Sequence, residues 1–334
     1  MKRWMAGFGL LIGLGILSVM LWRLDWHVFA EAFRQVRLPW LAVAISLALM
    51  GQALRALRWN IVSGRSLSQY SHFWHCAVIG QFCNFIYPLR AGDILRIMSL
   101  RKFANVPLGL AASSAVVDRV NDGFLLIVCL LVVLSLHGAD VIGVAGIAGI
   151  IGGFGLMVLG ATVFVVWGGR ARGMVERIGA KFPPRWAVRI GGSYENMLEV
   201  SGAFRRPWRV VGMVVVNILI VAADVGIVAV MLLTMGWELP LEAALTTIVF
   251  LWAGSALPSA PGFIGIFQIA CVLALGLYGI DGSSAFAFSV LLHLFSLFSA
   301  VAQGGAATLS YGINLRREYS RTLAQGGPAK VGET

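Results

Sequence analysis

The sequence has little charge. Only 12% of its 334 residues are Asp, Glu, Lys or Arg, whereas 59% are hydrophobic. Ordinary soluble domains carry about 25% charged residues, so this composition excludes that class and indicates a membrane protein. The alternating pattern of a membrane β-barrel is also missing, and apolar runs of about twenty residues recur along the chain. Because a backbone in lipid must satisfy its own hydrogen bonds, we expect an all-α polytopic fold.

Cysteine and histidine are scarce, with four and five residues respectively. No C-x-x-C pair and no H-E-x-x-H segment occurs, which argues against a zinc site, and we expect neither a metal nor another cofactor. Acidic residues are also few, at 15 against 26 Lys and Arg, but no nucleic-acid-binding motif accompanies the net charge of +11. The arginines gather between apolar runs, as the positive-inside rule predicts, so we expect no nucleic-acid partner.

About six apolar segments are long enough to be complete spans. They cover residues 5–22, 39–54, 107–136, 141–167, 210–235 and 284–312. Two further segments, 72–102 and 242–280, are apolar but interrupted. Lysine and arginine near both ends of the chain place the two termini in the cytoplasm. We expect one membrane domain (1–315), which includes a basic cytoplasmic loop with an amphipathic helix (168–209), and a short, disordered cytoplasmic tail (316–334).

Charge counting predicts that one interrupted segment turns back inside the membrane. Arg55, Arg58 and Arg65 follow the span 39–54 and precede segment 72–102, Arg101 lies near the end of that segment, and all four are expected in the cytoplasm. That segment is therefore interpreted as a re-entrant hairpin. Segment 242–280 lies between two loops without Lys or Arg, and is either a hairpin from the opposite face or two complete crossings. Two hairpins of opposite orientation would form an inverted repeat around a site near the membrane midplane.

The stretch CNFIYPLRAGDILR (83–96) combines a helix break with charge. Pro88 cannot continue a helix, and Asn84, one turn earlier, can donate to a carbonyl that the break frees. Gly92 permits either a close backbone approach or a positive φ. Charge beside a break in a membrane helix is typical of a cavity lining, and the alternative is an interfacial loop whose arginines meet lipid phosphates. The candidate binding residues here are Asn84, Pro88, Arg90, Gly92, Asp93 and Arg96.

The stretch SSAVVDRVNDGF (113–124) places charges inside an expected span. Asp118 and Asp122 share a helix face, while Arg119 and Asp122 are three residues apart and can pair. Each charge would cost about 2.5–3.5 kcal/mol at mid-bilayer if it were unpaired. The two motifs balance, which predicts a closed ion-pair network that is either architectural or opens to admit a charged headgroup. The balanced residues are Arg90, Arg96, Arg119, Asp93, Asp118 and Asp122.

The stretch ALPSAPGFIGIFQ (256–268) cannot be an ordinary helix. Its prolines and glycines predict that the backbone unwinds and restarts around Phe263. A restarting helix presents free N–H groups and a positive dipole end, which favour an anion, and the alternative is a tight bend between two spanning helices. The candidate residues are Pro258, Pro261, Gly262, Gly265 and Gln268.

One acidic residue stands alone in an expected span. Asp224 occurs in the apolar stretch NILIVAADVGIVAV, with Asn217 two turns earlier on the same face. A lone acidic residue within a membrane span is a candidate functional residue. Asp224 either carries a proton that couples transport or accepts a hydrogen bond from a neighbouring helix.

Together these motifs resemble the flippase-like transmembrane domain of the lysylphosphatidylglycerol synthases and their stand-alone relatives. The resemblance is carried by N-x-x-x-P-x-R-x-G-D-x-x-R from Asn84, V-D-R-x-x-D from Val117 and P-x-x-P-G-x-x-G from Pro258, with LRALRW at 54–59. It spans roughly residues 5–315. It implies a multi-pass protein of the bacterial inner membrane that moves a lipid or lipid-linked headgroup between leaflets, with membrane lipids as partners.

Two departures narrow what the resemblance implies. The full-length synthases carry a soluble aminoacyl-transfer domain after the membrane part, whereas only residues 313–334 follow the last expected span here. We therefore expect a transporter and not an enzyme. Relatives often have glutamate where this sequence has Gln268, which makes an aminoacylated cationic lipid a weaker candidate substrate.

The leading hypothesis is a lipid flippase. Arg90, Arg96 and Arg119 would hold an anionic phosphate, because guanidinium groups match phosphate oxygens. The two broken segments would enclose a midplane cavity. The rival hypotheses are an intramembrane enzyme that modifies a lipid phosphate and a non-catalytic membrane partner of a lipid-modifying enzyme.

Overall fold

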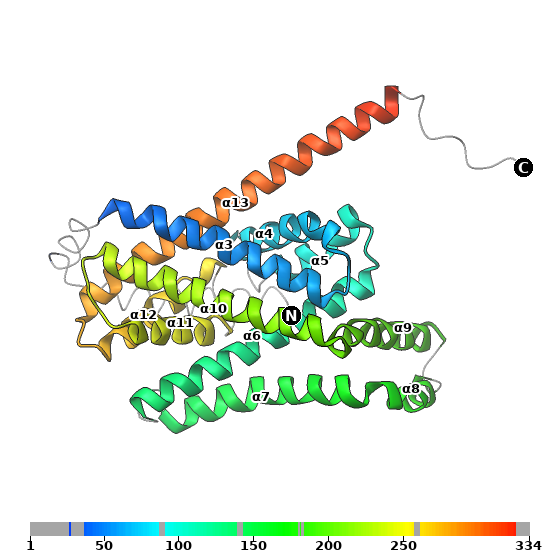
Figure 1. Ribbon diagram of the computed structural model, residues 1–334, viewed down its shortest axis with the longest axis horizontal. Helices are drawn as coiled ribbons and strands as arrows, with labels where there is room; N and C mark the ends of the chain where they lie inside the picture. The colour runs from blue at the N-terminus through cyan, green and yellow to red at the C-terminus, as the bar shows by residue number, and fades with distance from the viewer. Residues whose placement is uncertain are drawn as a thin grey trace, which may run out of the picture.

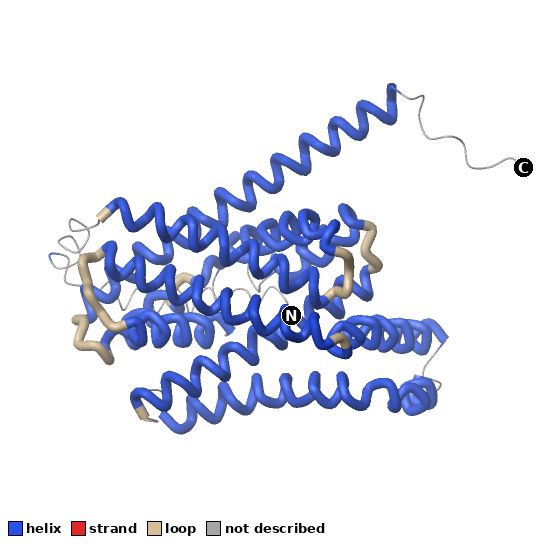
Figure 2. Tube along the Cα trace, in the orientation of Figure 1, coloured by secondary structure: helices blue, strands red, loops and turns tan. Residues whose placement is uncertain are grey.

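The computed structural model describes residues 27, 37–86, 91–138, 143–179, 181, 184–256 and 261–324. Within these ranges the chain forms helices joined by short turns, with no strand (Figures 1 and 2). The all-α prediction is therefore confirmed for the described residues. The expected first span, 5–22, lies outside them, as do Pro88, Arg90 and Pro258.

Four helices in the described part are long and apolar enough to cross a membrane. They are α3 (Leu38–Val62), α6 (Leu108–His137), α10 (Pro207–Thr234) and the Gly282–Ser310 part of α13 (Gly282–Ala324). A fifth helix, α7 (Gly143–Trp167), coincides with the expected span 141–167 and lies alongside α6 (Figure 1). The membrane architecture expected from the apolar runs is thus present in these helices.

Two boundaries differ from the sequence-based expectation. Helix α3 does not end near residue 54 but continues to Val62, because the polar side chains of its last turns find partners on other helices. Helix α13 continues to Ala324, whereas a disordered tail was expected from residue 316, and its end projects away from the bundle (Figure 1).

Each interrupted segment consists of two short helices that pack side by side. The first contains α4 (Tyr70–Ile86) and α5 (Ala91–Ala104), and the second contains α11 (Leu241–Ala256) and α12 (Ile266–Gly276). In the first pair, Gly80 faces Arg96 and Asn84 faces Gly92, so the two helices run in opposite directions. In the second, Gly254 faces Ile266, and Thr246 bonds to Tyr278 beyond the end of α12. Both interrupted segments are therefore helical hairpins.

The tips of the two hairpins meet. Between α11 and α12 the chain forms the 3-10 turn η6 (Pro261–Phe263), and this turn packs against α4. Gly262, Phe263 and Gly265 all have positive φ, which marks the expected unwinding and restart around Phe263. The Phe85 and Phe263 rings lie edge to face with centroids 6.0 Å apart. Residues 178 positions apart in the chain thus meet in the interior.

Gly92 lets the first hairpin close. A Cβ atom at this position would lie 1.9 Å from the Gly80 carbonyl oxygen and 2.6 Å from Asn84 Oδ1. The sequence left open a close approach or a positive φ, and the structure has the close approach. We expect Gly92→Ala to lower the free energy of unfolding by about 1–3 kcal/mol, since α4 and α5 must separate. The measurement is the apparent midpoint of thermal unfolding in detergent.

Gly276→Ala is the matched control for that prediction. Gly276 ends α12 of the second hairpin, and a Cβ atom there would meet no heavy atom within 4 Å. An unchanged midpoint in both variants would show that the Gly80–Gly92 approach does not limit hairpin packing.

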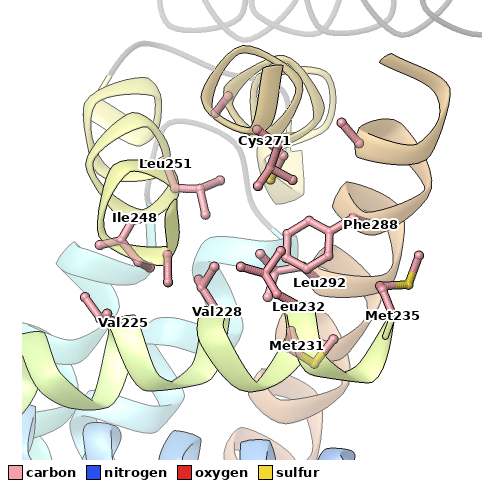
Figure 3. Close-up of a cluster of buried hydrophobic side chains, with 14 of the residues drawn as sticks. Val225, Val228, Met231, Leu232, Met235, Ile248, Leu251, Cys271, Phe288 and Leu292 are labelled. Atoms are coloured by element: carbon pink, nitrogen blue, oxygen red, sulfur yellow. The ribbon is translucent and has the colours of Figure 1, made fainter. Parts of the chain in front are cut away.

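Hydrophobic contacts hold the second hairpin between α10 and α13. Figure 3 shows Val228 and Met231 of α10 facing Leu251 of α11, Cys271 of α12 and Phe288 of α13. All of them belong to one cluster of buried side chains. This packing gives the hairpin tip a rigid base from which it reaches α4.

The basic segment expected as a loop is mostly helical. It contains η4 (Gly168–Ala171), α8 (Arg172–Gly179), α9 (Pro184–Ser201) and η5 (Gly202–Arg205). Helix α9 packs against α6, and the Tyr194 hydroxyl donates to the Gly168 carbonyl. The short turn η1 (Leu67–Gln69) links α3 to α4 at the same end of the molecule (Figure 1).

Candidate functional site

A cavity of about 340 Å³ lies where the two hairpins meet the long helices. Side chains from α3 to α6 and from α10 to α13 line it. Small-molecule sites typically measure about 300–1,000 Å³, so this cavity suits a small polar group. The predicted site residues that line it are Asn84, Asp93, Arg96, Asp118, Arg119, Asp122 and Asp224.

Arg58 is the centre of an ion-pair network on one wall of the cavity. Its Nε donates to Asp118 Oδ1 at 2.8 Å, and its Nη2 donates to Asp122 Oδ1 at 2.5 Å. Arg96 Nη1 donates to the second oxygen of Asp118 at 3.0 Å. Helix α3 thereby joins α5 and α6 through two carboxylates.

Arg119 closes the network into a ring. It donates through Nη1 to Asp122 Oδ2 at 2.7 Å and through Nη2 to Asp93. Asp93 Oδ1 in turn lies 3.7 Å from Arg96 Nε. Cations and anions therefore alternate around the ring, which carries no net charge. Its members, in order, are Arg96, Asp118, Arg58, Asp122, Arg119 and Asp93.

A closed network of the predicted kind is present among the described residues, and it includes Arg58, which was not predicted for it. Arg90, which was predicted to take part, lies outside the described residues. The pairing of Arg119 with Asp122 across one helical turn occurs as expected. A signal for Arg58 was present in the LRALRW stretch, but Arg55 and Arg58 were counted there as cytoplasmic loop charges. Both belong to α3 and line the cavity.

Burial makes this pairing necessary. The side chains of Arg58 and Asp118 are only 1% and 3% exposed. A charged side chain deep in a membrane costs about 2.5–3.5 kcal/mol or more, and breaking a buried pair leaves such a charge uncompensated. The Arg96 guanidinium also stacks over the Trp59 ring, with 4.7 Å from Cζ to the ring centroid.

A second ion pair continues the charged wall toward α10. Asp224 pairs with Arg55, so the acid that stood alone in the sequence has a cation from α3. On the same face of α10, Asn217 accepts a bond from Arg58 Nη1 at 3.2 Å and donates to Asn121 at 3.3 Å. The expected bond from a neighbouring helix to Asp224 is thus present.

Arg96 has donors to spare. Its Nη2 is buried and has no hydrogen-bond partner among the described residues, and its Nε lies beyond bonding distance from Asp93. The residue as a whole is 7% exposed and lines the cavity. A buried guanidinium with unpaired N–H groups beside a cavity is suited to an anion that brings its own oxygens.

The turn of the second hairpin is fixed by bonds within the chain. His293 Nε2 lies 2.6 Å from the Gly262 carbonyl, which can only accept, so Nε2 carries the proton. His293 Nδ1 then accepts from Gln268 Nε2 at 3.1 Å, and Gln268 Oε1 accepts from the Gly265 N–H at 2.8 Å. The helix start expected to offer a free N–H to an anion is therefore capped by Gln268.

Three of the residues predicted for this hairpin do not line the cavity. They are Gly262, Gly265 and Gln268, whereas Phe263 and Phe267 do line it. Pro261 begins η6. Their part is to shape the turn that carries the two phenylalanines. In the first hairpin, Gly92 also has a structural role, because it packs against Gly80 and does not line the cavity.

No curated protein and no solved structure matches the chain. The family model described as the lysylphosphatidylglycerol synthase TM region matches residues 7–304. That range contains every described helix except the end of α13, and it contains the whole ion-pair ring. The chain therefore belongs to the family of lysylphosphatidylglycerol synthase transmembrane regions.

Proposed function

We propose that the protein moves a lipid with an anionic headgroup between the leaflets of the bacterial inner membrane. The observation that carries this proposal is the charge-balanced ring, in which Arg96, a residue of the cavity lining, keeps N–H groups without partners among the described residues. A neutral ring costs less to keep inside a membrane than separate charges, and its spare donors favour a phosphate. Family membership supports a role in lipid modification or transport.

The lengths of the hairpin helices support two re-entrant segments. Helices α4, α5, α11 and α12 have 17, 14, 16 and 11 residues. At 1.5 Å per residue these lengths are about 17–26 Å, which is less than the hydrocarbon thickness of about 30 Å. Each helix pair therefore suits a hairpin that turns back at depth, covered by protein where its backbone is not helical.

The packing of the two halves supports an inverted repeat. Helix α3, the α4–α5 hairpin and α6 would correspond to α10, the α11–α12 hairpin and α13. Under this exchange the contact of α4 with α13 becomes that of α11 with α6, and α3 and α10 pack on each other. A site at the interface of such repeats, where helices break, is the usual arrangement in secondary transporters.

The basic helices set the orientation that we propose. Helices α8 and α9 lie at the end of the molecule where α3 ends and α10 begins (Figure 1). Their arginines favour the cytoplasmic face. Arg55 and Arg58 no longer contribute to this orientation, because they face the cavity, but Arg65 after α3 still does. The ring then lies in the cytoplasmic half of the membrane.

Transport is proposed in preference to catalysis. Both ring nitrogens of His293 are engaged in holding η6, and the four aspartates that line the cavity are all paired with arginine. Among the described residues no group of three His, Cys, Asp or Glu side chains is placed to hold a metal. The phosphate of a headgroup can replace a ring carboxylate as the partner of Arg96 without any covalent bond being broken. Asp224 stays our candidate for coupling this exchange to proton movement.

The test is leaflet exchange in vesicles. Purified protein reconstituted with fluorescent phosphatidylglycerol should expose inner-leaflet label to a membrane-impermeant quencher, whereas protein-free vesicles should not. Mass spectrometry of the same lipids tests the rival hypothesis of a lipid-modifying enzyme, since such an enzyme would change the mass of the lipid. Unaltered lipid that never crosses the bilayer, or crosses only with a co-purified second protein, would contradict the proposal.

A further inference from the structure

Neutral polar side chains form a second wall of the cavity, beside the charged one. Three glutamines from α3, α4 and α13 and two serines from α13 line it, and none of them belongs to the ion-pair ring. Amide and hydroxyl groups at such a position recognise neutral groups that both donate and accept hydrogen bonds. The residues of this neutral wall are Gln52, Gln81, Gln303, Ser296 and Ser299.

Gln303 has unused hydrogen-bonding capacity. Its Nε2 donates to Ser299 Oγ at 2.9 Å, but its Oε1 is buried without a partner among the described residues. The residue is 9% exposed. Asn84 also lines the cavity, but its Oδ1 lies toward Gly92 of α5. Gln303 therefore offers an unpaired acceptor in the same cavity lining as Arg96, which has unpaired donors.

A hydroxyl group suits the glutamine amide better than an ammonium group does. A hydroxyl donates and accepts, so it satisfies an amide in either orientation of its side chain, whereas an ammonium group only donates. A cation also lacks a counter-charge here. Each aspartate at the cavity has an arginine partner, and Gln268 uses both ends of its amide to hold the hairpin turn.

We infer that the headgroup carried is a phosphate ester of a small uncharged polyol, with its phosphate on Arg96 and its hydroxyls on Gln303. This inference rests on the proposed transport function. The cavity of about 340 Å³ is at the lower end of the range for ligand sites, which fits a glycerol-sized or single-sugar group. The same wall discriminates against a headgroup that ends in an amine or in a bare phosphate.

The experiment compares three fluorescent lipids in the same vesicles. Phosphatidylglycerol carries a polyol, phosphatidylethanolamine carries an amine, and phosphatidic acid carries neither. We expect exchange of phosphatidylglycerol to be about tenfold faster than that of the other two, as one or two buried hydrogen bonds would produce. Gln303→Leu should remove this advantage, and an unchanged midpoint of thermal unfolding in detergent would show that the variant is folded.

The control variant is Thr308→Val on the same helix. Thr308 bonds only to the Gly304 carbonyl, is exposed and does not line the cavity, so the preference should persist. Equal exchange rates for all three lipids, or an unchanged preference for phosphatidylglycerol in Gln303→Leu, would contradict the polyol inference but not the proposed transport function. Absence of exchange for every lipid overturns both. Uptake of radiolabelled glycerol phosphate by the vesicles would identify a soluble ester and overturn the lipid source.

Discussion

Replacing Arg58 by methionine is expected to lower the free energy of unfolding by about 3–5 kcal/mol, because Asp118 and Asp122 each lose a charged hydrogen-bond donor and the ring loses its charge balance. Arg58 joins Asp118 on one side and Asp122 on the other, and its own side chain is 1% exposed. Methionine keeps an unbranched side chain and fits an apolar environment, so the main change is the loss of the charged guanidinium. The measurement is the apparent midpoint of thermal unfolding in detergent, together with the yield of monodisperse protein.

A surface ion pair supplies the control. Arg172 donates twice to Glu195 between α8 and α9, but the two side chains are 58% and 50% exposed. Exposed pairs contribute only about 0–1 kcal/mol, so Arg172→Met should barely move the midpoint. The double variant Arg58→Met/Asp122→Asn should recover part of the loss, since it restores equal numbers of arginines and aspartates in the ring. Equal midpoints for Arg58→Met and Arg172→Met would mean that the ring does not hold the helices together.

The local features of this fold could be predicted from the sequence. The break after Asn84 and the unwinding around Phe263 follow from proline and glycine, whose backbone preferences act within a few residues. The pairing of Arg119 with Asp122 follows from helical spacing. The prediction of a neutral network was correct for a general reason, which is that unpaired charges are too costly inside a membrane.

The partners across helices could not be predicted in the same way. Arg58 bonds to Asp118, 60 residues away, and Arg55 bonds to Asp224, 169 residues away. The apolar run of α3 ends before these arginines, so charge counting assigned them to a loop. Only the packing of α6 and α10 against the last turns of α3 makes a helical, buried arginine possible there. Gln303 was missed because an isolated glutamine in a long apolar helix carries no spacing signal.

Arg96→Gln is expected to reduce leaflet exchange by about a hundredfold or more while the protein stays folded. The substitution orphans no carboxylate, since Asp118 keeps Arg58 and Asp93 keeps Arg119. The glutamine amide can still donate to Asp118. The variant loses the positive charge and the unpaired Nη2 donor, and hydrogen bonds to charged groups contribute about 1.5–3 kcal/mol each.

Arg96→Lys separates charge from geometry in the same assay. Lysine keeps the positive charge but lacks the planar fork that binds two phosphate oxygens, so its exchange rate should fall between those of the native protein and Arg96→Gln. Thermal midpoints close to the native value in both variants would assign the loss to transport and not to folding. Native exchange rates in Arg96→Gln would remove this arginine from the lipid path and leave the ring a purely structural device.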